Sequence, residues 1–164
     1  MISRQAKYAL RALFALSRLG DGESMLIAEI ARDQNIPKKF LEQILLALKR
    51  RGLVQSRRGA KGGYALLKPA AKITFADVLR IIDGPIAPLP CLSIIAYARC
   101  QDCITEEACE IRRVFARAVE PMRQVLEKTT IADAMTTGSA AGIRLGRPAT
   151  SPLRRRRTEP TPHY

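Results

Sequence analysis

Apolar residues near the start of the chain recur at intervals of three and four, which predicts a series of short helices. This spacing extends over residues 4–19, 27–34 and 38–51 and gives each segment one face that can pack inward. Pro37 stands where a first helical turn needs no N–H donor, and Gly52 stands where helices commonly end. A short helix, a tight turn and a longer helix with polar residues at its start are typical of a helix-turn-helix, whose second helix enters the major groove of DNA.

Two segments in which apolar and polar residues alternate, 53–56 and 64–67, predict the strands of a β-hairpin. The loop between them, residues 57–63, carries three cations and three glycines. Glycine lets a backbone approach phosphate closely, and the cations supply the matching charge. A solvated hairpin explains the strands but not the charge of the loop, so we interpret it as a wing beside the helix pair.

The second half of the chain predicts a short helix over residues 75–82, an irregular stretch over 86–106 and a long helix from about residue 105 to residue 128. One apolar stripe runs along the long helix and consists of Ile111, Val114, Phe115, Ala118, Met122, Val125 and Leu126. A stripe of this length is expected to pair with a second copy of the chain or to pack back on its own domain. Pro121, inside the helix, predicts a kink or a break.

These elements predict a mainly α fold with a small β-hairpin wing, a winged helix-turn-helix followed by a long dimerisation helix. The expected divisions are a DNA-binding domain over 1–84, a cysteine-bearing cofactor loop over 85–109 and a dimerisation helix with a closing turn over 110–135. Residues 136–164 read as a disordered basic tail, which either adds non-specific DNA affinity or is an inert extension.

The charge distribution supports a nucleic-acid partner. The chain has 164 residues and a formal net charge of +13, and residues 1–84 hold 16 Lys and Arg against 7 Asp and Glu. Positive charge concentrated in a folded half indicates a polyanion, most simply double-stranded DNA, whereas a basic protein without such a partner is the alternative.

No apolar run reaches the length of a membrane span, about 18 residues. The first residues also lack the apolar core of a secretion signal. We therefore expect a cytoplasmic protein without a membrane partner.

All four cysteines of the chain lie close together, at Cys91, Cys100, Cys103 and Cys109. Disulfides are rare in the cytoplasm, so such a cluster favours metal or redox chemistry. Thiolates suit iron–sulfur clusters and zinc, and they can also form a thiol–disulfide switch. The Cys-x-x-Cys pair lacks a surrounding βαβ pattern, and no serine, histidine and acid constellation accompanies it. We therefore expect neither an enzyme nor a small-molecule substrate, and an interaction module without DNA binding is the further alternative.

Five stretches, in order and at matching spacing, resemble the Rrf-type family of winged-helix transcription regulators, the family of IscR and NsrR. They are residues 7–11 (KYALR), 36–45 (IPKKFLEQIL), 58–66 (RGAKGGYAL), 73–78 (ITFADV) and 129–133 (TTIAD). The likeness covers about residues 1–135 and is far more specific than a helix-turn-helix pattern alone.

The resemblance implies a homodimer that binds near-palindromic operators, expected to act as a repressor. By position, Glu42 and Gln43 would face bases, where glutamate can accept from cytosine and glutamine can pair with adenine. Arg58 would enter the minor groove, and Arg57 and Lys61 would clamp phosphates. The full set of expected DNA-contacting residues is Lys38, Lys39, Glu42, Gln43, Arg57, Arg58, Lys61 and Gly62.

Many members of this family hold an iron–sulfur cluster with three cysteines between the wing domain and the long helix. Cys91, Cys103 and Cys109 stand at the corresponding positions, and five residues separate the last two, as in the family. Eleven residues separate Cys91 from Cys103, whereas the family commonly has about five. The additional length contains Cys100, so the resemblance leaves open whether Cys100, Cys103 or both bind the cofactor.

The fourth ligand varies within the family, and neither usual choice is present in this chain. Arg112 stands where some members have a histidine, and Lys7 stands where others have an acid. The simplest set is therefore all four cysteines, with Glu110 a more distant candidate. The resemblance favours an iron–sulfur cluster. Four thiolates suit either a 2Fe–2S or a 4Fe–4S centre, and we favour 2Fe–2S. The ligand set alone suits structural zinc, and a cluster-free or zinc-bound regulator with a thiol redox switch is the alternative function.

Overall fold

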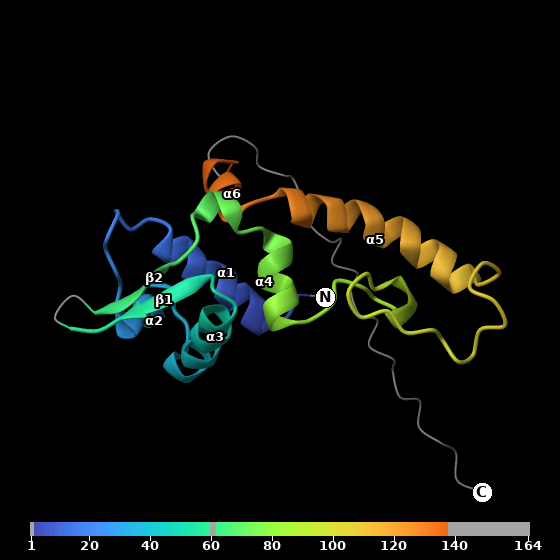
Figure 1. Cartoon of the computed structure of the whole chain (residues 1–164), viewed down its shortest axis with the longest axis horizontal. Coiled ribbons are helices and arrows are strands. Elements are labelled where there is room, and N and C mark those ends of the chain that lie inside the picture. Colours follow the sequence, from blue (N-terminus) through green and yellow to red (C-terminus); the bar gives the residue numbers. More distant parts are fainter. Residues whose placement is uncertain (1, 60–61, 138–164) are drawn as a thin grey trace, which may run out of the picture.

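The computed structural model describes residues 2–59 and 62–137 and confirms a mainly helical fold with a small hairpin (Figure 1). The helices are α1 (Arg4–Leu16), α2 (Ile27–Asp33), α3 (Lys38–Arg50), α4 (Phe75–Ile82), α5 (Glu110–Lys128) and α6 (Ile131–Thr137). The strands are β1 (Val54–Arg57) and β2 (Gly63–Leu66), and the 3-10 turns are η1 (Ala70–Lys72) and η2 (Pro90–Leu92). Residues 138–164, which hold nearly all of the expected basic tail, lie outside the described residues.

Helix α1 begins as its sequence predicts and ends earlier than expected. The Ser3 hydroxyl accepts from the Ala6 N–H at 3.0 Å and caps the first turn. At the other end, the Arg18 and Leu19 N–H groups bond three residues back, so the chain tightens into a turn. The Ser17 hydroxyl also donates to the Phe14 carbonyl at 3.0 Å. The helix therefore stops at Leu16, although the apolar period continues to Leu19.

One hydrophobic core joins helices α1 to α4 with the hairpin. The largest fully buried side chains are Leu13, Ile30, Leu41, Ile44, Leu45, Leu48, Ile73, Ile131, Val54 and Val78. The rings of Phe14 and Phe75 meet with their centroids 6.1 Å apart and connect α1 to α4. Ile131 comes from α6, beyond the long helix, so the end of the described chain completes the same core.

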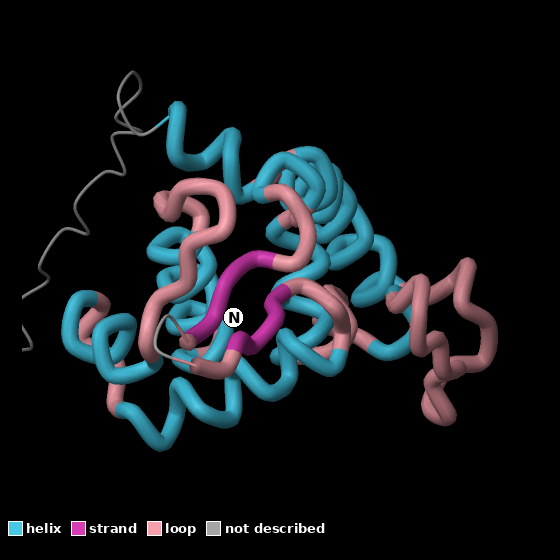
Figure 2. Tube along the Cα trace, turned by 60° about the vertical axis from the view of Figure 1, so that its left-hand side comes forward, coloured by secondary structure: helices cyan, strands magenta, loops and turns pink. Residues whose placement is uncertain are grey.

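The hairpin is antiparallel, with Val54 opposite Leu66 and Arg57 opposite Gly63. Figure 2 shows the two strands as a small ribbon among the helices. A backbone bridge adds the segment before α2, because Met25 and Tyr64 exchange N–H to carbonyl bonds of 2.9 and 2.8 Å. The wing is therefore attached to the helix-turn-helix by its backbone as well as by the connection from α3.

Helix α5 begins at Glu110, later than the apolar period predicts. The Cys109 sulfur accepts from the Arg112 N–H at 3.4 Å and caps the helix, while the Thr105 hydroxyl accepts from the Ala108 N–H in a separate turn. The predicted break at Pro121 is wrong, because α5 continues to Lys128. Pro121 cannot donate to the Arg117 carbonyl, and both residues lie on an exposed part of the helix.

Backbone bonds join the end of α5 to the start of α4. The Phe75 N–H donates to the Thr129 carbonyl at 3.0 Å, and the Ile131 N–H donates to the Ile73 carbonyl at 2.9 Å. From this junction α5 extends away from the helix-turn-helix toward the cysteine-bearing loop (Figure 1). Within the described residues, no helix is long and apolar enough to cross a bilayer.

Candidate DNA interface and cysteine site

Helix α3 separates its apolar and polar residues cleanly. Leu41, Ile44, Leu45 and Leu48 are buried in the core. Lys38, Lys39, Glu42 and Gln43 are all exposed at the start of the helix. The structure thus places the four expected contact residues of α3 on one solvent-facing segment. In a helix-turn-helix, this N-terminal part of the second helix contacts base edges.

A tight turn fixes α3 relative to α2. Asn35 has a positive φ of 49°, which asparagine tolerates better than most residues, and the Ile36 N–H donates to the Ala31 carbonyl at 2.8 Å. Pro37 precedes the first residue of α3 as its N-cap. The turn therefore has a defined geometry without a side-chain cap.

The expected wing residues differ in their surroundings. Arg58 is exposed at the end of the hairpin. Arg57 is also exposed, and its guanidinium donates to the Gly22 carbonyl, so this cation is directed along the loop before α2. A Cβ on Gly62 would lie 2.8 Å from the Gly59 carbonyl oxygen, which leaves room for glycine alone. Lys61 lies outside the described residues.

Sequence reasoning did not identify the contact that joins the wing to α3. The Lys49 ammonium donates to the Ser56 hydroxyl at 2.6 Å, between the end of α3 and strand β1. In the sequence, the helical period places Lys49 off the apolar stripe of α3 but does not indicate its partner on the hairpin. Its bond links the recognition helix to the hairpin.

The four cysteines line one open cavity of about 680 Å³ between the loop and the start of α5. Cys91 is buried in η2, and the other three are partly exposed. The cavity also contains apolar side chains, among them Ile104 and Ile111, and the guanidinium-bearing Arg99. The fold therefore brings together the four thiols that the sequence predicts as ligands.

The Cys103 thiol interacts with those of both Cys109 and Cys100. Its hydrogen bonds with Cys109 and then Cys100 raise the pKa of Cys103 to about 12. The Arg112 N–H, and next the Cys103 thiol, lower the pKa of Cys109 at the cap of α5. Among the described residues, no three His, Cys, Asp or Glu side chains converge on a point that suits a single metal ion.

Neither of the two positions where the family varies its fourth ligand offers one to the cavity. Arg112 forms an ion pair with Glu106, with Nε and Oε2 3.5 Å apart but without hydrogen-bond geometry. The Tyr97 hydroxyl donates to the same Glu106, and this hydrogen bond is the main reason that the pKa of Tyr97 is raised. Lys7 is exposed on α1, and Glu110 lines the cavity. Arg112 thus holds the loop rather than offering a ligand.

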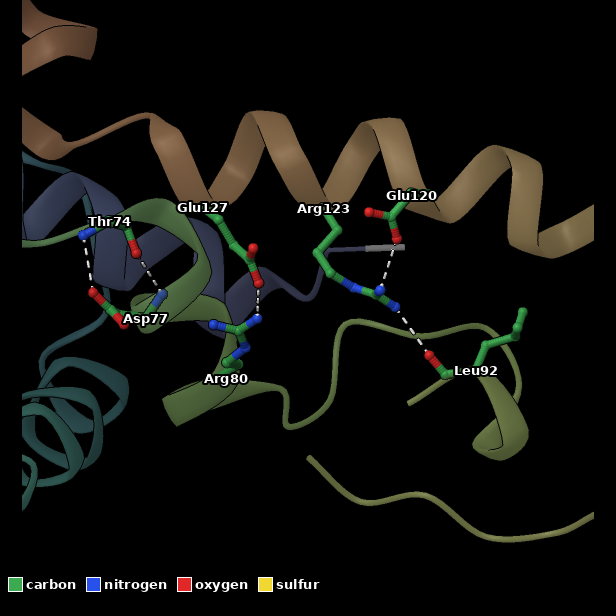
Figure 3. A network of polar contacts seen from close by, with 7 residues as sticks. All are labelled: Thr74, Asp77, Arg80, Leu92, Glu120, Arg123 and Glu127. Atoms are coloured by element: carbon green, nitrogen blue, oxygen red, sulfur yellow. Dashed lines mark hydrogen bonds and ion pairs between the residues drawn. The ribbon is translucent and has the colours of Figure 1, made fainter. Parts of the chain in front are cut away.

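Arg123 is a second residue that sequence reasoning did not identify. It is 8% exposed and donates to the Leu92 carbonyl at 2.9 Å and to Glu120 at 3.0 Å (Figure 3). In the sequence, Arg123 lies off the apolar stripe of the long helix, so the helical period gave no sign that this cation is buried. Its position connects α5 to the residue after Cys91.

Comparisons with known proteins agree with this architecture. The family model of Rrf2, described as an iron-dependent transcriptional regulator, matches residues 2–137. A protein of Rhodobacter capsulatus named as an Rrf2-like HTH-type transcriptional regulator is 44% identical over 144 residues, which cover 86% of this chain and 96% of the relative. The HTH-type transcriptional regulator CymR of Bacillus subtilis is 32% identical over 133 residues, 80% of this chain and 87% of CymR.

Solved structures give the same assignment. CymR of B. subtilis, described as the global cysteine regulator, has a TM-score of 0.69 and 29% identity and covers 83% of this chain and 96% of its own. IscR of T. potens has a TM-score of 0.66 at 23% identity, covers 89% and 93%, and shows the shared fold. These relatives are regulators rather than enzymes. The chain therefore belongs to the Rrf2 family of DNA-binding transcription regulators.

Proposed function

We propose that this regulator is a homodimeric repressor whose operator affinity is set by an iron–sulfur cluster bound to Cys91, Cys100, Cys103 and Cys109. The observation that carries the proposal is that all four thiols line one cavity. We favour 2Fe–2S over 4Fe–4S. When bound, such a cluster supplies metal–thiolate bonds that break or rearrange on oxidation.

The donor set fits the cluster. Four thiolates are the common ligand set of 2Fe–2S and 4Fe–4S centres. A structural zinc ion requires all of its sulfurs at about 2.3 Å from one point. A cluster instead distributes its ligands over several irons, so thiols spread along one cavity suit it. Because the cations Arg112 and Lys7 occupy the positions that supply a fourth ligand in other members of the family, the four cysteines are the simplest complete set of cluster ligands.

The loop residues connect cofactor binding to the helices. Cys91 lies in η2, and Cys109 caps α5, so ligation of both thiols would hold the turn against the start of the long helix. The ion pair of Arg112 with Glu106, and the bond from Tyr97 to Glu106, hold the intervening loop against α5. Release of the thiols would free residues 86–109, the segment that joins the DNA-binding domain to the dimer helix.

The exposed apolar face of α5 supports the homodimer. Ile111, Val114, Phe115, Met122 and Val125 are between 42% and 64% exposed, although their spacing gives them a common side of the helix. A second copy would cover this face and fix the separation of the two α3 helices, which must match half-sites one helical turn of DNA apart.

DNA contacts follow from the exposed residues of α3 and the wing. We propose that Glu42 and Gln43 read bases, that Lys38, Lys39, Arg57 and Lys61 bind phosphates, and that Arg58 enters the minor groove beside Gly62.

Purification without oxygen tests the cluster directly. Iron and acid-labile sulfide are measured per chain, together with the visible spectrum and the zinc content. We expect coloured protein with iron and sulfide in similar amounts, whose affinity changes when the cluster is removed. The DNA probe is a duplex selected from a random library by the wild-type chain (the selected duplex). Colourless, iron-free protein with stoichiometric zinc would exclude the cluster.

The contact of Cys103 with Cys109 and Cys100 favours one alternative, a thiol–disulfide switch. Two neighbouring thiols would reduce a small-molecule disulfide: one S–S bond forms in the protein, the bond of the small disulfide breaks, and two small thiols leave. The test treats iron-free protein with the small-molecule disulfide. A mass lower by two hydrogens, together with a changed affinity for the selected duplex, would support this switch.

A further inference from the structure

Arg123 is held in one position by the groups around it. Its guanidinium is nearly buried and donates to Glu120 on its own helix and to the Leu92 carbonyl. A buried guanidinium without acceptors is costly, so the position of α5 at Arg123 depends on the position of that carbonyl. Leu92 directly follows Cys91, and its N–H donates to the Leu89 carbonyl at 3.0 Å within η2.

One turn further along α5, Glu127 makes the next connection. Residues four apart lie on the same side of a helix, and Figure 3 shows Arg123 and Glu127 both directed from α5 toward the loop and α4. Glu127 forms an ion pair with Arg80 on α4, and both side chains are less than half exposed. The same side of α5 thus binds the Cys91 turn and α4.

Helix α4 is firmly joined to the helix-turn-helix. Thr74 and Asp77 form a reciprocal capping box of 3.1 Å bonds at its start. The helix then packs against both α1 and α3. A displacement of Arg80 therefore moves α4, which packs against α3. Helix α3 carries the exposed residues that are expected to contact DNA.

We infer that Arg123 is a positioning residue that transmits a change at Cys91 to the DNA-binding helices, through Glu127 and Arg80; this inference rests on the proposed cysteine-bound cofactor. When the η2 turn moves, Arg123 loses its carbonyl acceptor. Helix α5 then shifts relative to the turn, and the ion pair of Glu127 with Arg80 carries the shift to α4.

The first test compares Arg123→Met with wild type as full-length, cluster-loaded protein. Methionine keeps an apolar stem and removes the guanidinium. Iron content and visible spectrum are measured first, and then the affinity for the selected duplex with and without the cluster. The ratio of the two affinities, with the cluster and without it, measures the coupling, and coupled sites typically give ratios of about 5 to 150. We expect the variant to retain its iron. Its affinity ratio should fall to within about twofold of one.

Arg117→Met is the matched control, because Arg117 is exposed on the same helix and its substitution removes the same charge. This control should retain the wild-type ratio. An Arg123→Met protein that keeps the full ratio would overturn the inference. If the methionine variant does not fold or hold iron, Arg123→Lys takes its place, since lysine keeps the charge and one donor toward Leu92. An intermediate ratio is then expected, and an unchanged ratio overturns the inference.

Hydrogen exchange provides a test that does not require the cluster. Arg123→Met should exchange faster than wild type at the amides of residues 91–93, within the segment 90–93, and also at residues 79–82 of α4. Faster exchange confined to residues 90–93 would indicate a local role and overturn the inference. If the wild-type chain proves iron-free, the proposed cofactor fails, and the exchange at α4 still decides the role of Arg123.

Discussion

Cys100 is the cysteine that the family pattern does not explain. Its thiol interacts with Cys103 and lines the same cavity as Cys91. Both positions that supply a fourth ligand elsewhere in the family hold cations in this chain, Lys7 and Arg112. Within the proposed function, these observations are the reason we propose Cys100 as the fourth ligand.

We expect Cys100→Ser to hold its iron at least about tenfold more weakly than wild type. Mutation of residues that only hydrogen-bond to metal ligands already weakens metal affinity by about that factor, and loss of a ligand should cost no less. Iron and sulfide per chain after anaerobic desalting provide the measurement. Cys91→Ser is the positive control, and Gln101→Ser, exposed on the same loop, is the negative control. Full iron content in Cys100→Ser would show that the cluster uses another fourth ligand.

Single residues show where sequence reasoning succeeded and where it could not. The exposure of Glu42 and Gln43 followed from the helical period, since they lie off the apolar stripe of α3. The partners of Arg123 did not follow, because Leu92 contributes a carbonyl, and a backbone acceptor leaves no mark on the side-chain pattern. The same applies to Arg57 and the Gly22 carbonyl.

At the level of elements, the helix-turn-helix, the hairpin and α4 were predicted within a few residues. Their ends follow from local signals such as Ser3, Thr74 and Gly52. The start of α5 was missed because a cysteine cap is an unusual signal and the apolar period continues before it. Of the kink or break expected at Pro121, the break is wrong, because one lost backbone bond at an exposed position does not end a helix that packs against α4.

The contact of the hairpin with the segment before α2 leads to a test at Gly63. A Cβ at this position would lie 2.5 Å from the Met25 carbonyl oxygen, and φ is +143°. We expect Gly63→Ala to break the bridge of Met25 with Tyr64, to lower the free energy of unfolding by about 1–3 kcal/mol and to weaken DNA binding.

Urea denaturation and binding to the selected duplex measure the two effects. Gly59→Ala is the control, because Gly59 also has a positive φ, of +102°, but among the described residues beyond its chain neighbours no atom lies within 4 Å of its Cβ position. Equal losses in both variants would mean that backbone strain, rather than the bridge, determines the stability of the wing.

At the scale of the whole molecule, the proposed function requires two copies of the chain to meet through the apolar face of α5. Val114 belongs to that face and, at 64%, is the most exposed of its five large apolar side chains. We expect Val114→Glu to shift the protein from dimer to monomer, because a carboxylate in an apolar interface loses its hydration. Sedimentation velocity would show this shift. Affinity for the selected duplex should fall by a factor of about 10 or more, because one protomer contacts only one half-site.

Arg117→Glu places the same carboxylate on an exposed polar position of α5 and should remain a dimer. A Val114→Glu protein that still sediments as a dimer would assign the interface to another surface.

The burial of Ile131 has a consequence for the order in which the molecule is made. Its side chain is fully enclosed by the core of α1 to α4, although it follows the cysteine loop and the long helix in the chain. A protein leaves the ribosome from its N-terminus, so all four thiols emerge before Ile131 can enter that core. The helices that hold DNA therefore reach their final packing only after the cysteines have been synthesised. A nascent chain therefore carries its whole cysteine cluster before its DNA-binding half is complete.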